Sequence, residues 1–264
     1  MKLLLKIKYN GAPYCGFQYQ PDAPTVQGTL TEKISESLGL PVTVTGCSRT
    51  DAGVHALGYV AAVAPREEGL LDSEWCTVPS SKLHRVINQC LPESIAVVGA
   101  CRVDNGFHPR YDAVGKEYVY LIDDSVTADP FGVGRAYHVK KRLTDADIEK
   151  MNRAARCLLG KHDFSAFMAS GSSVTDTVRT LTTLRAERDG VYVKVTAASD
   201  GFLYNMVRIL TGTLLGVAFG SIDENDLTKI LASGERSMAG ATAPAHGLYL
   251  NRVFYAEEPA FEAD

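Results

Sequence analysis

The first half of the chain alternates between two hydrophobic periodicities. Residues 3–9, 42–45, 57–63 and 95–103 alternate apolar and polar side chains or are rich in β-branched ones, which predicts strands. Two intervening stretches carry apolar residues at helical spacing: Val26, Leu30, Ile34 and Leu38, then Leu83, Val86, Ile87, Cys90 and Leu91. Thr25 is the expected N-cap of the first of these helices. The resulting order, strand-helix-strand-strand-helix-strand, is that of a split βαβ, ferredoxin-like unit.

The second half repeats this order with one extra helix. The predicted strands are residues 116–122, 178–187, 191–197 and 248–255, and Asp189-Gly190 supplies a hairpin turn. Helices are predicted from a capping box that begins at Thr144, over residues 202–217, and near Asp223.

The two halves predict an α+β fold. We expect two ferredoxin-like (split βαβ) halves with mainly antiparallel sheets and a cleft between them, which the family resemblance described below would make catalytic. Asp104-Asn-Gly breaks the periodicity, so we place the boundary there. Residues 1–104 then form an N-terminal α+β domain and residues 105–264 a C-terminal one.

Charge neither favours nor excludes a nucleic-acid partner. The chain of 264 residues has a net charge of −4, but four of its 31 acids follow Tyr255, and without them 27 acids face 27 bases. RNA binding would require the bases to gather on one face. Residues 135–156 are the richest in bases, but acids are interleaved, so this segment predicts equally an RNA contact or a solvated helix face.

Several function classes lack their motifs. The six cysteines show no Cys-x-x-Cys spacing, which argues against zinc and against a disulfide framework, and no ATP loop or dinucleotide fingerprint is present. Residues 202–217 are too short for a membrane span and contain Arg208, and Lys6 and Lys8 interrupt the apolar start of the chain. We therefore expect a soluble cytoplasmic protein without metal or cofactor.

The turn of residues 46–56 concentrates reactive side chains between two predicted strands. It places Arg49, Asp51 and His55 on a glycine-flanked loop. Without further information, Asp51 could equally cap the amides of Gly53 or Val54 in an Asx-turn. His55 lies four residues from Asp51, but the segment reads as turn then strand, so we expect a hydrogen-bonding brace and no metal pair.

Two further positions in the second half could carry chemistry. Arg208 lies among apolar residues on a predicted helix, where a guanidinium needs an anionic partner or must extend to solvent. Tyr118 and Tyr120 project from one face of a strand, as core aromatics would.

Residues 49–56, Arg-Thr-Asp-Ala-Gly-Val-His-Ala, resemble the signature of the tRNA pseudouridine synthase A family. Further stretches resemble family elements: residues 9–18, 88–92, 116–120, 202–212 and 242–250. The resemblance implies that Asp51 is the nucleophile and that Tyr118 stacks on the target uracil. It also implies that Arg208 pairs with Asp51 and that Arg49 takes part in extruding the nucleotide. Ser48 stands where the family often has glycine.

Carried to function, the resemblance implies an isomerase that converts uridines 38 to 40 of the tRNA anticodon stem-loop to pseudouridine, without a cofactor and as a homodimer. The residues do not decide whether Asp51 attacks the base or the ribose. Two other classes stay open: a non-catalytic RNA-binding protein of ferredoxin-like fold, which would not need Arg208 opposite Asp51, and a hydrolase, which would need more acids near Asp51.

Overall fold

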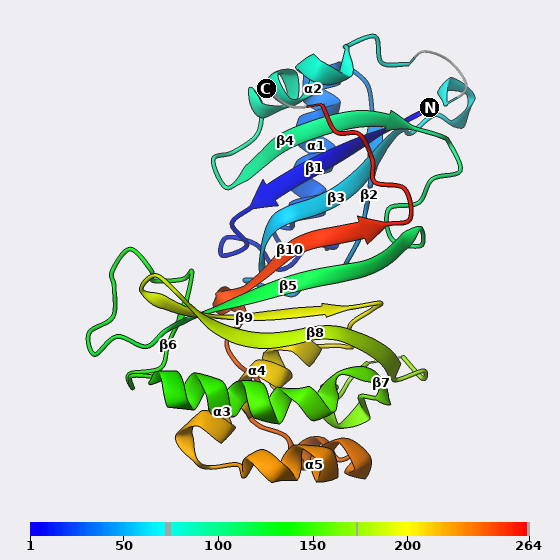
Figure 1. The fold of residues 1–264 in the computed structure, drawn as a ribbon. Helices are drawn as coiled ribbons and strands as arrows, with labels where there is room; N and C mark the ends of the chain where they lie inside the picture. Colours follow the sequence, from blue (N-terminus) through cyan, green and yellow to red (C-terminus); the bar gives the residue numbers. More distant parts are fainter. Residues whose placement is uncertain (72–74, 173, 263–264) are drawn as a thin grey trace. The chain divides into compact units, whose positions relative to one another are not determined.

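The computed structural model describes residues 1–71, 75–172 and 174–262 and contains two compact units (Figure 1). Unit 1 comprises Met1–Val114 together with the chain from Leu250 onward, and unit 2 comprises Gly115–Tyr249. The domains proposed above, 1–104 and 105–264, remain a proposal. The units differ from them in two places, because the division falls at Val114 and the last strand returns to unit 1.

The sheet of unit 1 contains β1 (Lys2–Tyr9), β2 (Val42–Gly46), β3 (His55–Pro65), β4 (Ile95–Val103) and β10 (Leu248–Tyr255). The order is β4-β1-β3-β10, and β2 pairs with β3. The pairs β1 with β3, β1 with β4 and β2 with β3 are antiparallel. The last strand of the chain therefore lies beside β3, whereas the other strands of unit 1 come from the first 103 residues.

Two helices, α1 (Val26–Leu38) and α2 (Ser80–Asn88), lie on one face of this sheet (Figure 1), and a short 3-10 helix, η1 (Glu68–Leu70), lies between β3 and α2 in the chain. The predicted order β-α-β-β-α-β is confirmed. On β1, Leu5 and Ile7 are fully buried, whereas Lys6 and Lys8 on the opposite face are exposed.

The ends of these helices follow from local chemistry. Thr25 caps α1 as predicted, because its side chain accepts a hydrogen bond from the amide of Gly28. The prediction that α2 extends through Cys90 and Leu91 is wrong. Asn88 ends the helix with its side-chain amide bound to both backbone groups of Val97 in β4, at 2.8 Å each. Pro92 further disfavours helical backbone at the residue before it.

The sheet of unit 2 contains β5 (Ala113–Asp123), β6 (Tyr137–His138), β7 (Gly160–Asp163), β8 (Val178–Asp189) and β9 (Tyr192–Ser199). Its order is β5-β9-β8-β7, with antiparallel pairs, and β6 adds a short parallel pair to β5. The hairpin predicted between β8 and β9 is confirmed, and its glycine adopts the left-handed conformation that such turns require. The protein is thus an α+β protein with mainly antiparallel sheets.

Helices α3 (Asp145–Ala155) and α4 (Met206–Phe219) lie on one face of this sheet, and α5 (Leu227–Ser233) packs near β7 (Figure 1). The capping box at Thr144 is confirmed, since Thr144 and Asp147 exchange side-chain and backbone hydrogen bonds. The remaining short helical turns are 3-10 helices: η2 (Arg156–Leu158), η3 (Ser165–Phe167), η4 (Glu224–Asp226), η5 (Arg236–Met238) and η6 (Ala245–Gly247).

Helix α4 begins four residues later than predicted. Asn205 adopts a left-handed conformation with φ of 59°, which prevents residues 202–205 from joining the helix. From Met206 onward nearly all faces of α4 are buried, as the sequence indicates. In the described part of the chain, no helix has both the length and the apolar character that a membrane crossing needs.

Candidate active site

The turn that carries Asp51 connects β2 to β3 in unit 1. The amide of Val54 donates to the carbonyl oxygen of Asp51 at 3.1 Å, which closes a four-residue turn. Gly53 holds the position with φ of 77°, where a side chain would be strained. The hydrogen bond and the glycine together fix the backbone of Asp51. The residue itself is half-buried.

The loop after β1 holds this turn from the side of His55. The amide of Gly11 donates to Nδ1 of His55 at 3.0 Å in a buried position. A Cβ at residue 11 would lie 1.9 Å from the carbonyl oxygen of Val54, so only glycine permits this approach. The hydrogen-bonding brace predicted for His55 is confirmed, and Nδ1 accepts, so a neutral imidazole carries its proton on Nε2.

The same loop holds the other side of Asp51. The amide of Phe17 donates to the carbonyl oxygen of Thr50 at 3.0 Å, and the Thr50 hydroxyl shares a buried hydrogen bond of 2.7 Å with the hydroxyl of Tyr9. Gly16 approaches Thr50 with φ of 97°. Both chain neighbours of the turn are therefore tied to β1 and its loop.

Ser48 is held by a tyrosine from β3. The Tyr59 hydroxyl donates to the carbonyl oxygen of Ser48 and accepts from its amide, while the Tyr59 ring stacks on Phe17 with centroids 4.4 Å apart. Among the described residues, only Lys140 and Asn205 combine a side chain with positive φ. Ser48 thus replaces the glycine of the resembling pattern without backbone strain.

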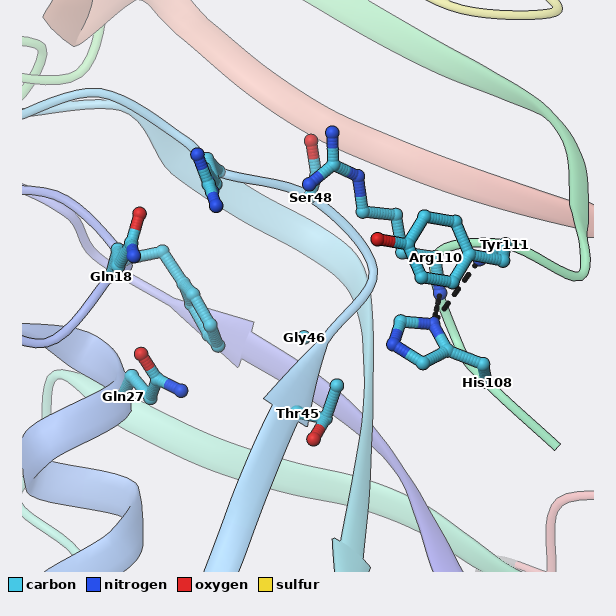
Figure 2. A pocket seen from close by; sticks show the side chains of 10 residues that line it. Gln18, Gln27, Thr45, Gly46, Ser48, His108, Arg110 and Tyr111 are labelled. Atoms are coloured by element: carbon cyan, nitrogen blue, oxygen red, sulfur yellow. Dashed lines mark hydrogen bonds between the residues drawn. The ribbon is translucent and has the colours of Figure 1, made fainter. Parts of the chain in front are cut away.

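Arg49 is exposed and lines a pocket of about 220 Å³ in unit 1. The pocket also receives His108, Arg110 and Tyr111 from the segment between β4 and β5, opposite Gln18 (Figure 2). No motif or periodicity in the sequence predicts a role for this segment. The available signal was the adjacency of a histidine, an arginine and a tyrosine in a stretch without periodicity.

In unit 2, Arg208 lies half-buried in the first turn of α4. Its Nε donates to the carbonyl oxygen of Ala243 at 2.7 Å, and its Nη1 donates to Oδ1 of Asn205 at the same distance. The amide of Ala243 in turn donates to the carbonyl oxygen of Arg208. Neutral oxygens therefore set the plane of the guanidinium, and pairing with Asp51 stays a prediction. No pattern in the sequence marks Asn205, whose backbone is left-handed and whose Oδ1 accepts from Arg208.

Tyr118 lies on β5, opposite Ala197 of β9, and is buried with its ring edge-on to Phe202 at 5.1 Å. Tyr120 is fully buried and donates to the carbonyl oxygen of Pro244 at 2.7 Å. Burial raises the pKa of Tyr120 well above its ordinary value, although the charge of Arg208 opposes the shift. Tyr120 is thus a neutral packing residue.

Within the described residues, no three His, Cys, Asp or Glu side chains are grouped as a metal site requires. Asp51 and Arg49 belong to unit 1, and Tyr118 and Arg208 to unit 2. Each unit thus contains two of the four predicted site residues, and hydrogen bonds within that unit hold the backbone around them.

Comparison with known proteins places this chain among enzymes. The sequence model of a family described as tRNA pseudouridine synthase matches residues 6–112 and 154–256. The tRNA pseudouridine synthase A of Acetivibrio thermocellus is 44% identical over 251 residues, which are 95% of this chain and 98% of that protein. Those of Thermoanaerobacter sp. (strain X514) and Ruminiclostridium cellulolyticum are each 41% identical and cover 96% of this chain and 99% of their own length. The chain therefore belongs to the tRNA pseudouridine synthase family.

Proposed function

We propose that this protein isomerises uridine to pseudouridine in tRNA, at positions 38 to 40 of the anticodon stem-loop, with Asp51 as the nucleophile. Membership of the family and the names of its relatives support the reaction and the class of RNA. The role of Asp51 as the nucleophile is supported by the fixed backbone of the turn that bears it. Hydrogen bonds at Thr50 and His55 and a closing bond at Val54 hold the backbone on both sides of the carboxylate.

The chemistry explains why one carboxylate can suffice. The bond between N1 of uracil and C1′ of ribose breaks, a bond between C5 and C1′ forms, C5 loses its proton and N1 gains one. Attack by Asp51 at C1′ or at the base would give a covalent intermediate that divides this rearrangement into smaller steps. The product has the atoms of the substrate, so the overall reaction consumes no co-reactant.

A carboxylate attacks only when it is ionised, and an adjacent guanidinium favours that state. We assign this role to Arg208, whose plane is set by Asn205 and Ala243. Tyr118 would stack on the extruded uracil, since an aromatic face binds a base without needing its hydrogen-bonding edge. Arg49 would assist extrusion, which costs a few kcal/mol of unstacking.

The decisive experiment incubates wild type and Asp51→Asn with an unmodified tRNA transcript and maps pseudouridine at each position. We expect product from wild type and none from Asp51→Asn, with unchanged tRNA affinity and an unchanged circular dichroism spectrum. Product from Asp51→Asn would remove Asp51 from its role. Tight binding by wild type without any product would instead favour a non-catalytic RNA-binding protein.

Assembly and location follow from the same proposal. We expect a homodimer in the cytoplasm, where tRNA is modified. Light scattering on the purified protein at several concentrations measures the mass, and a monomer at every concentration would reject the dimer.

A further inference from the structure

The pocket beside Arg49 is lined by polar, cationic and aromatic side chains from unit 1. Its volume of about 220 Å³ falls below the ~300–1,000 Å³ of pockets for drug-sized ligands, so it suits a single small group. All of its lining residues belong to unit 1. Arg49 lies two residues before Asp51, and the pocket therefore opens beside the proposed catalytic turn.

The lining is cationic. Arg49 and Arg110 are both exposed, and no acidic side chain lines the pocket. Among the described residues, neither guanidinium forms an ion pair or a side-chain hydrogen bond, and Arg110 has only its contact with the Tyr111 ring at 5.8 Å. Two unneutralised arginines beside one cavity are suited to bind a phosphate, because the guanidinium fork matches its oxygens.

The lining also presents an aromatic face. Tyr111 is 75% exposed, and its ring lies against His108 with centroids 4.2 Å apart (Figure 2). A large aromatic side chain this exposed leaves apolar surface in water, as a stacking platform for a base does in a protein that binds unpaired RNA.

The segment that bears these groups is pre-organised. Nδ1 of His108 accepts hydrogen bonds from the amides of Arg110 and Tyr111, at 3.1 and 3.3 Å (Figure 2). The buried hydroxyl of Tyr255 in β10 donates to the carbonyl oxygen of Pro109 at 2.8 Å. The backbone that presents the arginine and the tyrosine is therefore fixed before any ligand arrives, which lowers the entropy cost of binding.

The two glutamines that line the pocket differ in whether their side-chain amides are already hydrogen-bonded within the protein. Both ends of the Gln27 amide are engaged, since Nε2 donates to Val44 and Oε1 accepts from the amide of Tyr19. Gln18 is exposed and, within the described residues, no hydrogen bond restrains its amide. Gln18 can therefore donate a hydrogen bond to a base edge or accept one from it.

We infer that this pocket binds a second nucleotide of the substrate RNA, unpaired and distinct from the uridine that reacts. Its base stacks on Tyr111 and its phosphate lies between Arg49 and Arg110. The inference rests on the proposed function for the identity of the RNA. It adds a binding site that would hold a neighbour of the target nucleotide while Asp51 acts.

Photo-crosslinking tests the site directly. A series of tRNA transcripts carries 5-iodouridine at one position at a time, and each is bound to wild type and irradiated. We expect Tyr111 to crosslink to a nucleotide other than the target, with the crosslinked peptide identified by mass spectrometry. Crosslinking of Tyr111 to the target uridine alone, or no crosslink at Tyr111 from any position, would overturn the inference.

Variants provide the energetic test. Tyr111→Ala should weaken tRNA binding about 5- to 150-fold, the range for loss of one stacked base, and Tyr111→Phe should restore it. Arg110→Gln should lower the slope of log affinity against log salt by about 0.7–0.9 for one lost phosphate contact. Arg66→Gln, an exposed arginine of unit 1 outside the pocket, is the matched control and should change neither quantity.

The outcomes separate the two proposals. If wild type forms pseudouridine while Tyr111→Ala and Arg110→Gln bind tRNA like wild type, the second-nucleotide site is wrong and the proposed function stands. If wild type forms no pseudouridine but Tyr111 still crosslinks and Tyr111→Ala still loses affinity, the RNA site stands and the proposed enzyme falls.

Discussion

One added methyl group at position 11 should damage both stability and catalysis. In Gly11→Ala, the new Cβ would lie 1.9 Å from the carbonyl oxygen and 2.6 Å from the carbonyl carbon of Val54. Both are backbone atoms of the turn that carries Asp51, so no side-chain rotation relieves the clash. Either the loop after β1 or the turn itself must move.

The magnitude follows from the contacts that such a movement breaks. Overpacking a buried site costs about 1–3 kcal/mol. Displacing the Gly11 amide from Nδ1 of His55 leaves a buried donor without its partner, which costs about 1–3 kcal/mol more. The free energy of unfolding should therefore fall by about 2–6 kcal/mol, a large fraction of the total of a typical domain.

Urea denaturation followed by circular dichroism measures the stability, and pseudouridine formation in a tRNA transcript measures the activity. The matched control is Gly106→Ala, also in unit 1, where a Cβ would meet no atom within 4 Å and φ is not positive. We expect the control to lie within about 0.5 kcal/mol of wild type. If Gly11→Ala matched that control in both assays, the loop after β1 would not hold the turn.

Three further predictions concern unit 2. Arg208→Met should abolish turnover while tRNA affinity is largely kept, and an active variant in single-turnover assays would reject the ion pair with Asp51. Asn205→Ala should cost about 1 kcal/mol more stability than Asn205→Gly in urea denaturation, because alanine opposes the left-handed backbone; equal losses would contradict this. Burial alone would raise the pKa of Asp124, but hydrogen bonds from Arg188 and the Leu143 amide and the nearby arginine charges hold it below its ordinary value. This stability is present above the unfolded pKa, near 3.9, and is lost as pH falls through the folded pKa. Asp124→Asn should therefore lower the free energy of unfolding by about 3 kcal/mol at pH 7, and by progressively less below about pH 4. Urea denaturation of wild type and variant, at pH 7 and at a series of values below pH 4, measures this difference. A difference that does not change with pH would refute the ion pair.

Elements with strong local signals could be predicted from the sequence. Helix α1 begins after the predicted cap at Thr25, and the hairpin at Gly190 has the left-handed glycine that its turn requires. The start of α4 could not be predicted in this way, because residues 202–204 are as compatible with a helix as those that follow. Asn205 is a residue type that tolerates the left-handed conformation, but only the structure shows that it adopts this conformation here and accepts a hydrogen bond from Arg208.

In the candidate site, too, only the residues that are contiguous in the sequence could be predicted. The turn at Asp51 could be located because its residues are contiguous. Its supports could not, since Tyr9 and Gly11 lie more than 40 positions away and meet it only through the pairing of β1 with β3. The pocket residues around Tyr111 depend on hydrogen bonds to one imidazole, and no periodicity marks such an arrangement.

Strand β10 delays the assembly of unit 1 until the end of synthesis. It lies beside β3, where a Cβ at Gly58 would meet the carbonyl oxygen of Asn251 at 2.3 Å. A ribosome must therefore translate all of unit 2 before the first sheet can receive its last strand. Until then the backbone groups of β3 on that side are open to other strands, so a nascent or prematurely terminated product is exposed to aggregation and to chaperones. Only full-length translation yields a first unit whose sheet is complete.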